Sequence, residues 1–167
     1  MEHPGAGQAT DELEEALKAV LAYRPAVKKW AKNPIKEWAG GESVDGILTL
    51  RYPVYQEEIG GFLECLGRFM LLWTPAPGNY LDAVDKCPVP LEDSTKVREY
   101  LATANTETVK ALLTFVWRGE RFCDGFLGRW MEKGLVAALL DRLDELSVQS
   151  EFAGVGHSDQ NSLNAKP

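Results

Sequence analysis

The sequence predicts a mainly α-helical, compact single domain of several helices, with a short β-hairpin or an extended segment near residues 44–55. Two observations carry this prediction. Apolar residues recur at the three- and four-residue spacing of amphipathic helices, and capping residues and glycines separate these stretches. At 167 residues and 45% hydrophobic content, the chain has the size and apolar fraction of one domain. We expect residues 1–9 to be a disordered N-terminus, residues 10–148 the domain, and residues 149–167 a disordered C-terminal tail.

The first helix is predicted to begin after Asp11, because Glu14 follows it at the spacing of a capping box. Pro25 then ends this helix or begins a second segment, which Asn33-Pro34 interrupts. The second segment combines four lysines with two tryptophans: Lys28, Lys29, Trp30, Lys32, Lys36 and Trp38.

The pattern becomes extended between residues 40 and 55. Gly40-Gly41 and Asp45-Gly46 are turn signals, and residues 47–51 read as a short extended piece. Tyr52-Pro53-Val54-Tyr55 continues it, because the proline holds the preceding tyrosine in an extended conformation. The sequence does not decide whether this stretch pairs into a small sheet.

The remainder is predicted to be helical, apart from a loop at residues 74–80 and an irregular stretch at residues 81–92. Asn105 or Thr106 should cap one helix, Gly119 should end it in a left-handed conformation, and Asp124 should cap the next. The expected helices run over residues 56–73, 94–104, 106–118, 125–133 and 135–146.

Cysteine and histidine placement argues against several kinds of site. Cys65, Cys87 and Cys123 are far apart and form no Cys-x-x-Cys pair, so neither a disulfide scaffold nor a zinc site is expected. His3 and His157 both lie in the expected tails. We therefore expect no metal and no cofactor.

Charge and hydropathy exclude further classes of protein. A net charge of −7 argues against general nucleic-acid binding, which requires positive charge. The longest apolar runs, residues 69–73 and 135–140, are too short to span a bilayer. Residues 1–10 lack the basic start and apolar stretch of a signal peptide. We expect a cytoplasmic protein without a membrane partner.

The most informative stretch is a charged corner between two apolar helices, residues 118–125. Arg118, Glu120, Arg121 and Asp124 fall within one tight turn. Arginines can fork onto a phosphate or a carboxylate, and a carboxylate can act as a base or a ligand. The corner is therefore a candidate site for a small anionic ligand, although the sequence identifies no catalytic residue.

The same corner also has a purely structural interpretation. Arg118 could interact with the end of its own helix, and Glu120 could pair with Arg121 or with an arginine elsewhere. Asp124 could accept backbone N–H groups at a helix start. Phe122 would then be the core anchor of the turn.

Three residues near these features allow alternatives. Tyr52 and Tyr55 would join the ligand site if folding brought the start of the long helix against the corner. Cys123 is either an activated thiol near two arginines or, as we prefer, a small buried residue.

Two stretches bear on nucleic-acid binding. Lys28, Lys29, Trp30 and Lys32 could contact a single strand weakly, since aromatic and basic residues together stack on bases and neutralise phosphates. A solvated helix face over core tryptophans is the alternative. The last helix resembles a recognition helix only by position, because its charged residues are mainly acidic. We therefore expect no sequence-specific DNA binding. The charged residues of this last helix are Asp141, Arg142, Asp144 and Glu145.

The stretch Trp117-Arg-Gly-Glu-Arg-Phe-Cys-Asp-Gly125, followed by Glu132-Lys-Gly134 and Leu140-Asp-Arg-Leu143, resembles an uncharacterised bacterial domain family. That family has an Arg-Gly-Glu-Arg-Phe-x-Asp-Gly signature and a Leu-x-Arg-Leu ending. Tyr52-Pro-Val-Tyr55 is similar to its aromatic entry to a long helix. The resemblance implies a helical fold and a bacterial or phage origin, and it implies no activity.

These observations favour a non-enzymatic protein-interaction or regulatory domain with a protein partner. An acidic surface fits a basic or nucleic-acid-binding partner, and a phage- or plasmid-encoded inhibitor of a nucleic-acid-binding machine would be one such case. The alternatives are an enzyme or binder of a small phosphate or carboxylate ligand at residues 118–124, and a single-stranded nucleic-acid binder at residues 28–36. The oligomeric state is not predicted.

Overall fold

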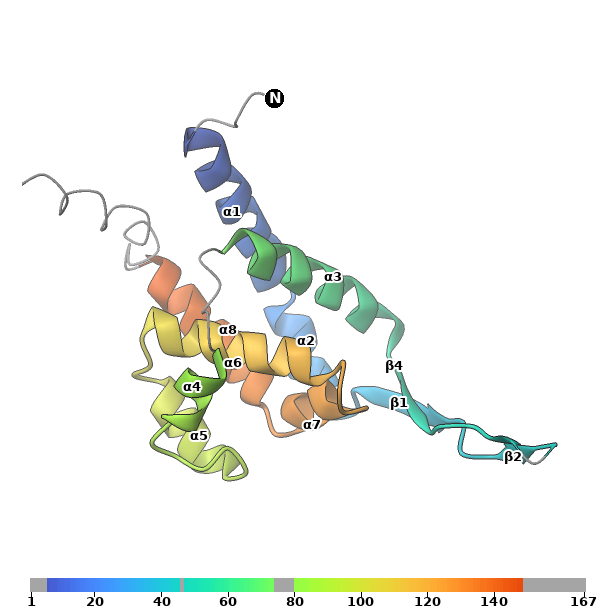
Figure 1. Ribbon diagram of the computed structural model, residues 1–167. Helices are drawn as coiled ribbons and strands as arrows, with labels where there is room; N and C mark the ends of the chain where they lie inside the picture. Colours follow the sequence, from blue (N-terminus) through green and yellow to red (C-terminus); the bar gives the residue numbers. More distant parts are fainter. Residues whose placement is uncertain (1–5, 46, 74–79, 149–167) are drawn as a thin grey trace, which may run out of the picture.

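A computed structural model describes residues 6–45, 47–73 and 80–148, and it confirms a mainly α-helical fold with a β-hairpin (Figure 1). The helices are α1 (Ala6–Leu21), α2 (Arg24–Trp30), α3 (Glu57–Leu72), α4 (Tyr80–Asp85), α5 (Ser94–Leu101), α6 (Thr106–Gly119), α7 (Phe126–Glu132) and α8 (Leu135–Val148). The strands are β1 (Ile35–Ala39), β2 (Ser43–Val44), β3 (Ile47–Leu48) and β4 (Tyr52–Tyr55). No helix of the described part is long and apolar enough to cross a membrane.

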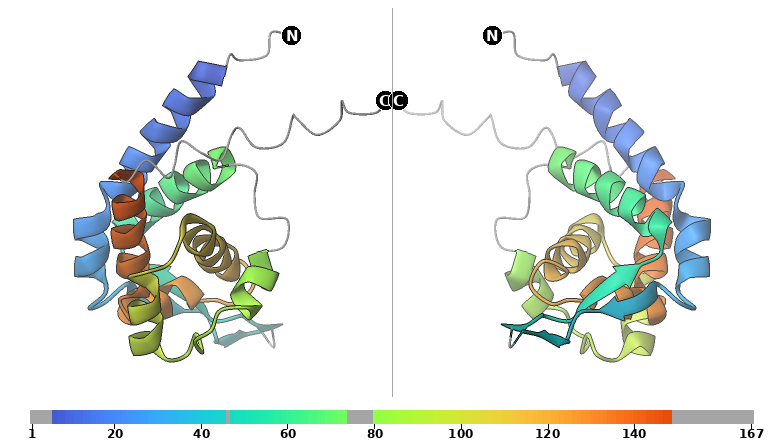
Figure 2. Two further views of the ribbon diagram at one scale, coloured as in Figure 1. Left: turned by 90° about the vertical axis from the view of Figure 1, so that its left-hand side faces the viewer. Right: turned by 90° about the vertical axis from the view of Figure 1, so that its right-hand side faces the viewer.

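Helix α6 lies at the centre of the helical body. In Figure 2 it is seen nearly end-on, with α3, α4, α7 and α8 around it, and it contacts all four. Its apolar face is fully buried, and burying each such side chain contributes about 1.5–3 kcal/mol to stability. That face consists of Val109, Leu112, Leu113 and Val116. Both ends of α6 are therefore fixed by the core, including the end that leads into the corner.

The strands form an antiparallel hairpin that projects from one end of the helical body (Figure 1). Its inner part pairs β1 with β4, from Ile35 opposite Tyr55 to Ala39 opposite Tyr52, with an irregularity in register after Ile35. Its outer part pairs β2 with β3. Asp45, at the tip, has a φ of 53°, the left-handed conformation that Asp-Gly turns of tight hairpins adopt.

The junction between the two parts of the hairpin requires glycine. Gly40 and Gly41 have φ values of 76° and 82°, which side-chain-bearing residues rarely adopt. A Cβ atom on Gly40 would lie 2.2 Å from the carbonyl oxygen of Leu50, closer than any real contact. The chain thus continues past β1 only because it has no side chain there.

Several predicted elements are confirmed. The predicted long helix matches α3, with Gln56 and Trp73 as its caps. Asn105 caps α6 by accepting a hydrogen bond from the backbone N–H of Thr108 at 2.9 Å. Gly134 has a φ of 70° and separates α7 from α8.

Three predictions about the backbone were wrong. Helix α1 begins at Ala6, ahead of Asp11, because the alanines before Asp11 favour helix. Residues 1–5 and the expected tail at residues 149–167 lie outside the described residues. Residues 80–85 form α4, whose single buried residue, Val84, gives no periodicity to detect. Asn33-Pro34 interrupts the second segment as expected, but the part after it, with Lys36 and Trp38, is strand β1 and not a helix face.

Candidate functional site

Glu120, the residue that follows α6, holds the corner together. Its Oε1 atom accepts hydrogen bonds from the Tyr55 hydroxyl at 2.7 Å and from the Gly125 backbone N–H at 3.3 Å. Its Oε2 atom accepts from the Leu127 backbone N–H at 2.7 Å. The carboxylate also lies at the start of α7, where the helix dipole favours negative charge. Glu120 thereby links α6, α7 and strand β4.

Tyr55 is the partner that the hairpin contributes to this network. Its hydroxyl donates to Glu120 and accepts from the Gly128 backbone N–H at 3.3 Å. Burial, followed by the hydrogen bond to the Glu120 carboxylate and its charge, raises the pKa of the hydroxyl well above its usual value near 10. The tyrosine is therefore neutral at physiological pH and serves as a fixed donor.

Glycines in the corner let the base of the hairpin approach closely. A Cβ on Gly125 would lie 2.8 Å from the Trp38 ring, and Gly125 also has a φ of 75°. A Cβ on Gly128 would lie 2.8 Å from the end of the Ile35 side chain. Any larger residue would push the hairpin away from α7, so these glycines and the Glu120 network together fasten the hairpin to the helices.

This arrangement corrects five structural predictions about the corner. Gly119 belongs to α6, and Gly125 is the left-handed residue. Glu120 pairs with Tyr55 and backbone N–H groups rather than with an arginine. Asp124 is exposed, and Gly125 stands at the cap position of α7.

The other two corrections concern the residues in the middle of the turn. Phe122 is 86% exposed, because Phe126 takes the inward position and packs edge-on against Phe115. Cys123 is also exposed, and its sulfur accepts a hydrogen bond from Arg129 at 3.0 Å. Neither residue is the buried one that was expected.

The arginines of the corner lie over aromatic rings. The Arg118 guanidinium is 5.1 Å from the Tyr80 ring centre, and the Arg121 guanidinium is 5.4 Å from that of Trp117. Among the described residues, neither arginine forms an ion pair.

The two tyrosines that were expected near the corner differ in position. Tyr55 contacts Glu120, while Tyr52 remains exposed on β4.

Four exposed residues lie on the two segments that Gly125 brings into contact, and we call them the hairpin–corner surface: Trp38, Arg51, Phe122 and Arg129. Trp38 lies over Gly125, and the Arg51 guanidinium lies 5.2 Å from the centre of the Trp38 ring. Phe122 belongs to the turn before Gly125, and Arg129 contacts Cys123 in that same turn. Trp38 is 41% exposed despite its size.

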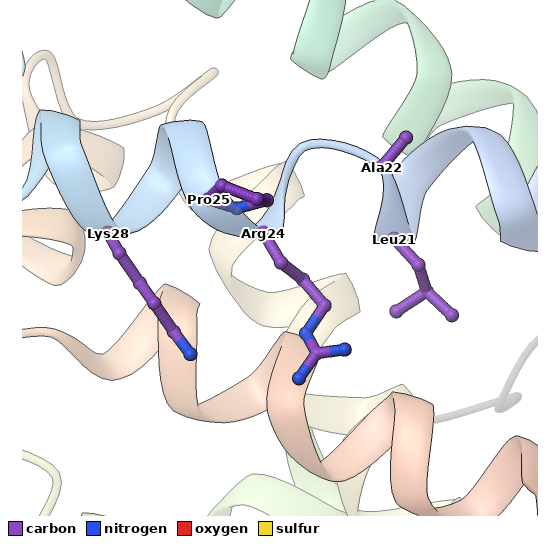
Figure 3. Close-up of a pocket in the computed structure, with 5 residues that line it drawn as sticks. All are labelled: Leu21, Ala22, Arg24, Pro25 and Lys28. Carbon is purple, nitrogen blue, oxygen red and sulfur yellow. The ribbon is translucent and has the colours of Figure 1, made fainter.

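A second charged group, the α2–α8 ion-pair cluster, consists of Arg24, Lys28, Asp141 and Asp144. Arg24 donates to Asp141 from two nitrogens, at 3.0 and 2.7 Å, and also bonds to Asp144. Lys28 bonds to the other oxygen of Asp141 at 2.9 Å. Figure 3 shows Arg24 and Lys28 extending from α2 toward α8, and together with Leu21, Ala22 and Pro25 they line a pocket.

Asp141 shows how tightly this cluster is paired. Burial alone would raise the pKa of its carboxyl, but hydrogen bonds from Lys28 and Arg24 outweigh burial and lower it. The Arg24 guanidinium has a raised pKa, chiefly because of its bond to Asp141. The cluster therefore joins α2 to α8 as a charged structural contact.

The residues proposed for single-stranded nucleic-acid contact do not share one accessible face. Trp30 is only 6% exposed and packs against Tyr23 and Phe62, so its ring cannot stack on a base. Lys28, Lys29 and Lys32 are exposed, but Lys28 is paired with Asp141 in the α2–α8 ion-pair cluster.

Sequence reasoning missed Trp38, Arg51 and Arg129 as site residues. Trp38 was assigned to a basic segment, and it reaches Arg51 and the corner residue Gly125 only through the folding of the hairpin. The signal that could have indicated them is the run of turn residues between two short extended stretches, which is typical of a hairpin.

The contacts described for the corner use the Glu120 carboxylate structurally. Both oxygens of Glu120 are engaged with donors that α7 and β4 supply. Within the ranges that the structure describes, no three His, Cys, Asp or Glu side chains are grouped to hold a metal ion.

Comparison with known proteins identifies a family, but the function of that family is unknown. No curated protein and no solved structure matches the chain. A family of unknown function, DUF6508, matches residues 12–149, which include the hairpin, the corner and the α2–α8 ion-pair cluster. The chain belongs to this family of unknown function, DUF6508.

Proposed function

We propose that this chain is a non-enzymatic protein-interaction domain that contacts its partner through the hairpin–corner surface. The supporting observation is that some residues of this region are structural while others are exposed. Glu120 and Tyr55 point inward and fix the hairpin, while Phe122 and Trp38 remain exposed on the fixed base. Large aromatic residues and arginines on a rigid support are the residue types that dominate binding energy at protein interfaces.

The projecting hairpin extends this surface. Ile47 and Leu50 are 71% and 82% exposed, although aliphatic side chains of this size are usually buried. Because the inner part of the hairpin is fastened to α7, these side chains are carried on an arm whose direction is set by the helical body. A partner that covered both the arm and the corner would bury them together.

The test is affinity capture from a lysate of the source organism with matched variants. Phe122→Ser should leave the thermal unfolding temperature almost unchanged, because the side chain is exposed, and it should remove the captured partner. Leu71→Ser is the matched control, since Leu71 is 70% exposed on α3. A partner retained equally by both variants would contradict the proposal.

The finer form of this proposal, which is more specific, is that the domain regulates or inhibits a nucleic-acid-binding machine. Identification of the captured partner by mass spectrometry tests it directly. A nucleic-acid-binding protein that depends on Phe122 supports the finer form, and a Phe122-dependent partner of another class leaves only the general one.

A small phosphate or carboxylate ligand at the corner is the second candidate. It is favoured by Arg118 and Arg121, which are exposed and lie over rings without forming an ion pair in the described part of the chain. Inorganic phosphate should then raise the unfolding temperature of the wild-type chain more than that of Arg121→Ala. Equal responses would contradict this candidate.

A further inference from the structure

We infer that the partner presents carboxylates to the hairpin–corner surface, so that the recognised feature is an acidic protein patch with an apolar centre. This inference rests on the proposed function and adds the chemistry of the partner. It differs from the expectation of a basic partner, which came from the net charge of the whole chain.

The first argument is the state of the arginines. Arg51 lies over Trp38, Arg121 lies over Trp117, and Arg129 lies 6.0 Å from the centre of the Phe126 ring. All three are exposed, and none forms an ion pair among the described residues. A ring face orients a guanidinium and leaves N–H groups at its edge available for a carboxylate.

The second argument is that carboxylates are abundant elsewhere in the chain. Acidic residues outnumber basic ones by 25 to 18, and Arg24 alone contacts both Asp141 and Asp144. The four residues of the hairpin–corner surface, by contrast, include two arginines and no carboxylate, while the exposed carboxylates of Glu37, Asp124 and Glu132 lie near them in the chain. Arg51 and Arg129 are therefore points of positive charge on an acidic protein. An acidic partner would be repelled by most of the molecule and attracted here, which would orient binding.

A nucleic acid is the competing source of negative charge, and the neighbouring side chains favour a protein. Trp38 and Phe122 are exposed rings that could stack on bases, but the hairpin beside Arg51 also exposes the aliphatic residues Ile47 and Leu50, which offer a base no stacking partner. The net charge of −7 would also oppose a polyanion that extends beyond the patch. A compact acidic patch avoids most of that repulsion.

The experiment selects random 12-residue peptides displayed on phage against the immobilised full chain, and then measures the best peptide by fluorescence anisotropy. Enriched peptides should combine Asp or Glu with a large apolar residue. Arg129→Glu and Arg51→Glu should each weaken that peptide by about tenfold or more. Lys86→Glu changes the net charge equally at an exposed position away from the corner and should leave binding unchanged.

Each other outcome contradicts the inference, the proposed function or both. Basic or uncharged peptides that still require Phe122 would overturn the acidic-partner inference and leave the proposed function intact. Selected peptides that bind Phe122→Ser as well as the wild type, or a selection that enriches nothing, would overturn both. A 20-nucleotide thymidine strand that binds more tightly than the best peptide, through Arg129, would replace the protein patch with a nucleic acid.

Discussion

The corner at residues 118–125 and the α2–α8 ion-pair cluster are both rich in charge, but they use it in opposite ways. In the cluster, Arg24 and Lys28 meet the carboxylates of Asp141 and Asp144. In the corner, Glu120 accepts from neutral donors, and the arginines lie over rings. One region joins two helices by opposite charges, while the other fastens a hairpin and leaves its cations outward.

The difference shows that charge density alone does not identify a binding site. A charged group that is paired within the fold stabilises the fold and is not available to bind another molecule. A charge that the fold orients but does not pair retains its capacity to bind something else. The four substitutions below test this contrast, from the largest expected effect to the smallest.

Glu120→Ala should have the largest effect on stability. It removes three hydrogen bonds at once and leaves the Tyr55 hydroxyl and the Leu127 N–H without their acceptor. We expect the free energy of unfolding to fall by about 3 kcal/mol, measured by urea denaturation. Glu132→Ala, at an exposed position of α7, is the control. A loss below about 1 kcal/mol would mean that Glu120 is not the fastener of the hairpin.

Asp141→Asn should cost about 2 kcal/mol at pH 7, because Arg24 and Lys28 both lose a charged partner. Asp85→Asn, exposed on α4, provides the comparison. The pKa of the Asp141 carboxyl is lowered in the fold. Its contribution is therefore fully present above the unfolded value near 4 and is lost as the pH falls through the folded pKa. Wild-type stability should decline there more steeply than that of the variant. Parallel acid profiles would show that the cluster is not paired in solution.

Tyr55→Phe should cost about 1 kcal/mol, since it removes one donor from Glu120 but keeps the ring. The pKa of the Tyr55 hydroxyl is raised in the fold. Its contribution is present below the unfolded value near 10 and is lost as the pH rises toward the folded pKa. Unfolding curves above pH 10 should therefore converge for the variant and the wild type. Tyr52→Phe, at an exposed position, should behave as wild type throughout.

Arg121→Ala should have the smallest effect, below about 1 kcal/mol, because an exposed guanidinium over a ring contributes little to folding. Thermal unfolding followed by circular dichroism measures it. A fall of several degrees in the unfolding temperature would place this arginine in a structural pair and would remove the contrast between the two regions.

Much of the fold could be predicted from local pattern. The apolar faces of α3 and α6, the cap at Asn105 and the break at Gly134 each depend on residues close together in the chain. Such features are visible in sequence because the chemistry that specifies them is local. The corner was located for the same reason.

The partners within the corner could not be predicted, because they depend on long-range contacts. Tyr55 and Glu120 are separated by 65 positions, and Arg24 and Asp141 by 117. Phe122 and Phe126 are one helical turn apart, and only the assembled core decides which of them turns inward. An interpretation limited to neighbours therefore assigned the wrong phenylalanine to the core.

The hairpin enters and leaves the helical body at almost the same point. Ile35 pairs with Tyr55, and the Gln56 N–H donates to the Pro34 carbonyl at 3.1 Å. The outer part of the hairpin, residues 42–49, lies beyond the two glycines of the junction and away from this entry point. Replacing it with a foreign loop should therefore leave the contacts between the helices unaltered. The binding specificity of the hairpin can in this way change while the helical body that sets its direction stays the same.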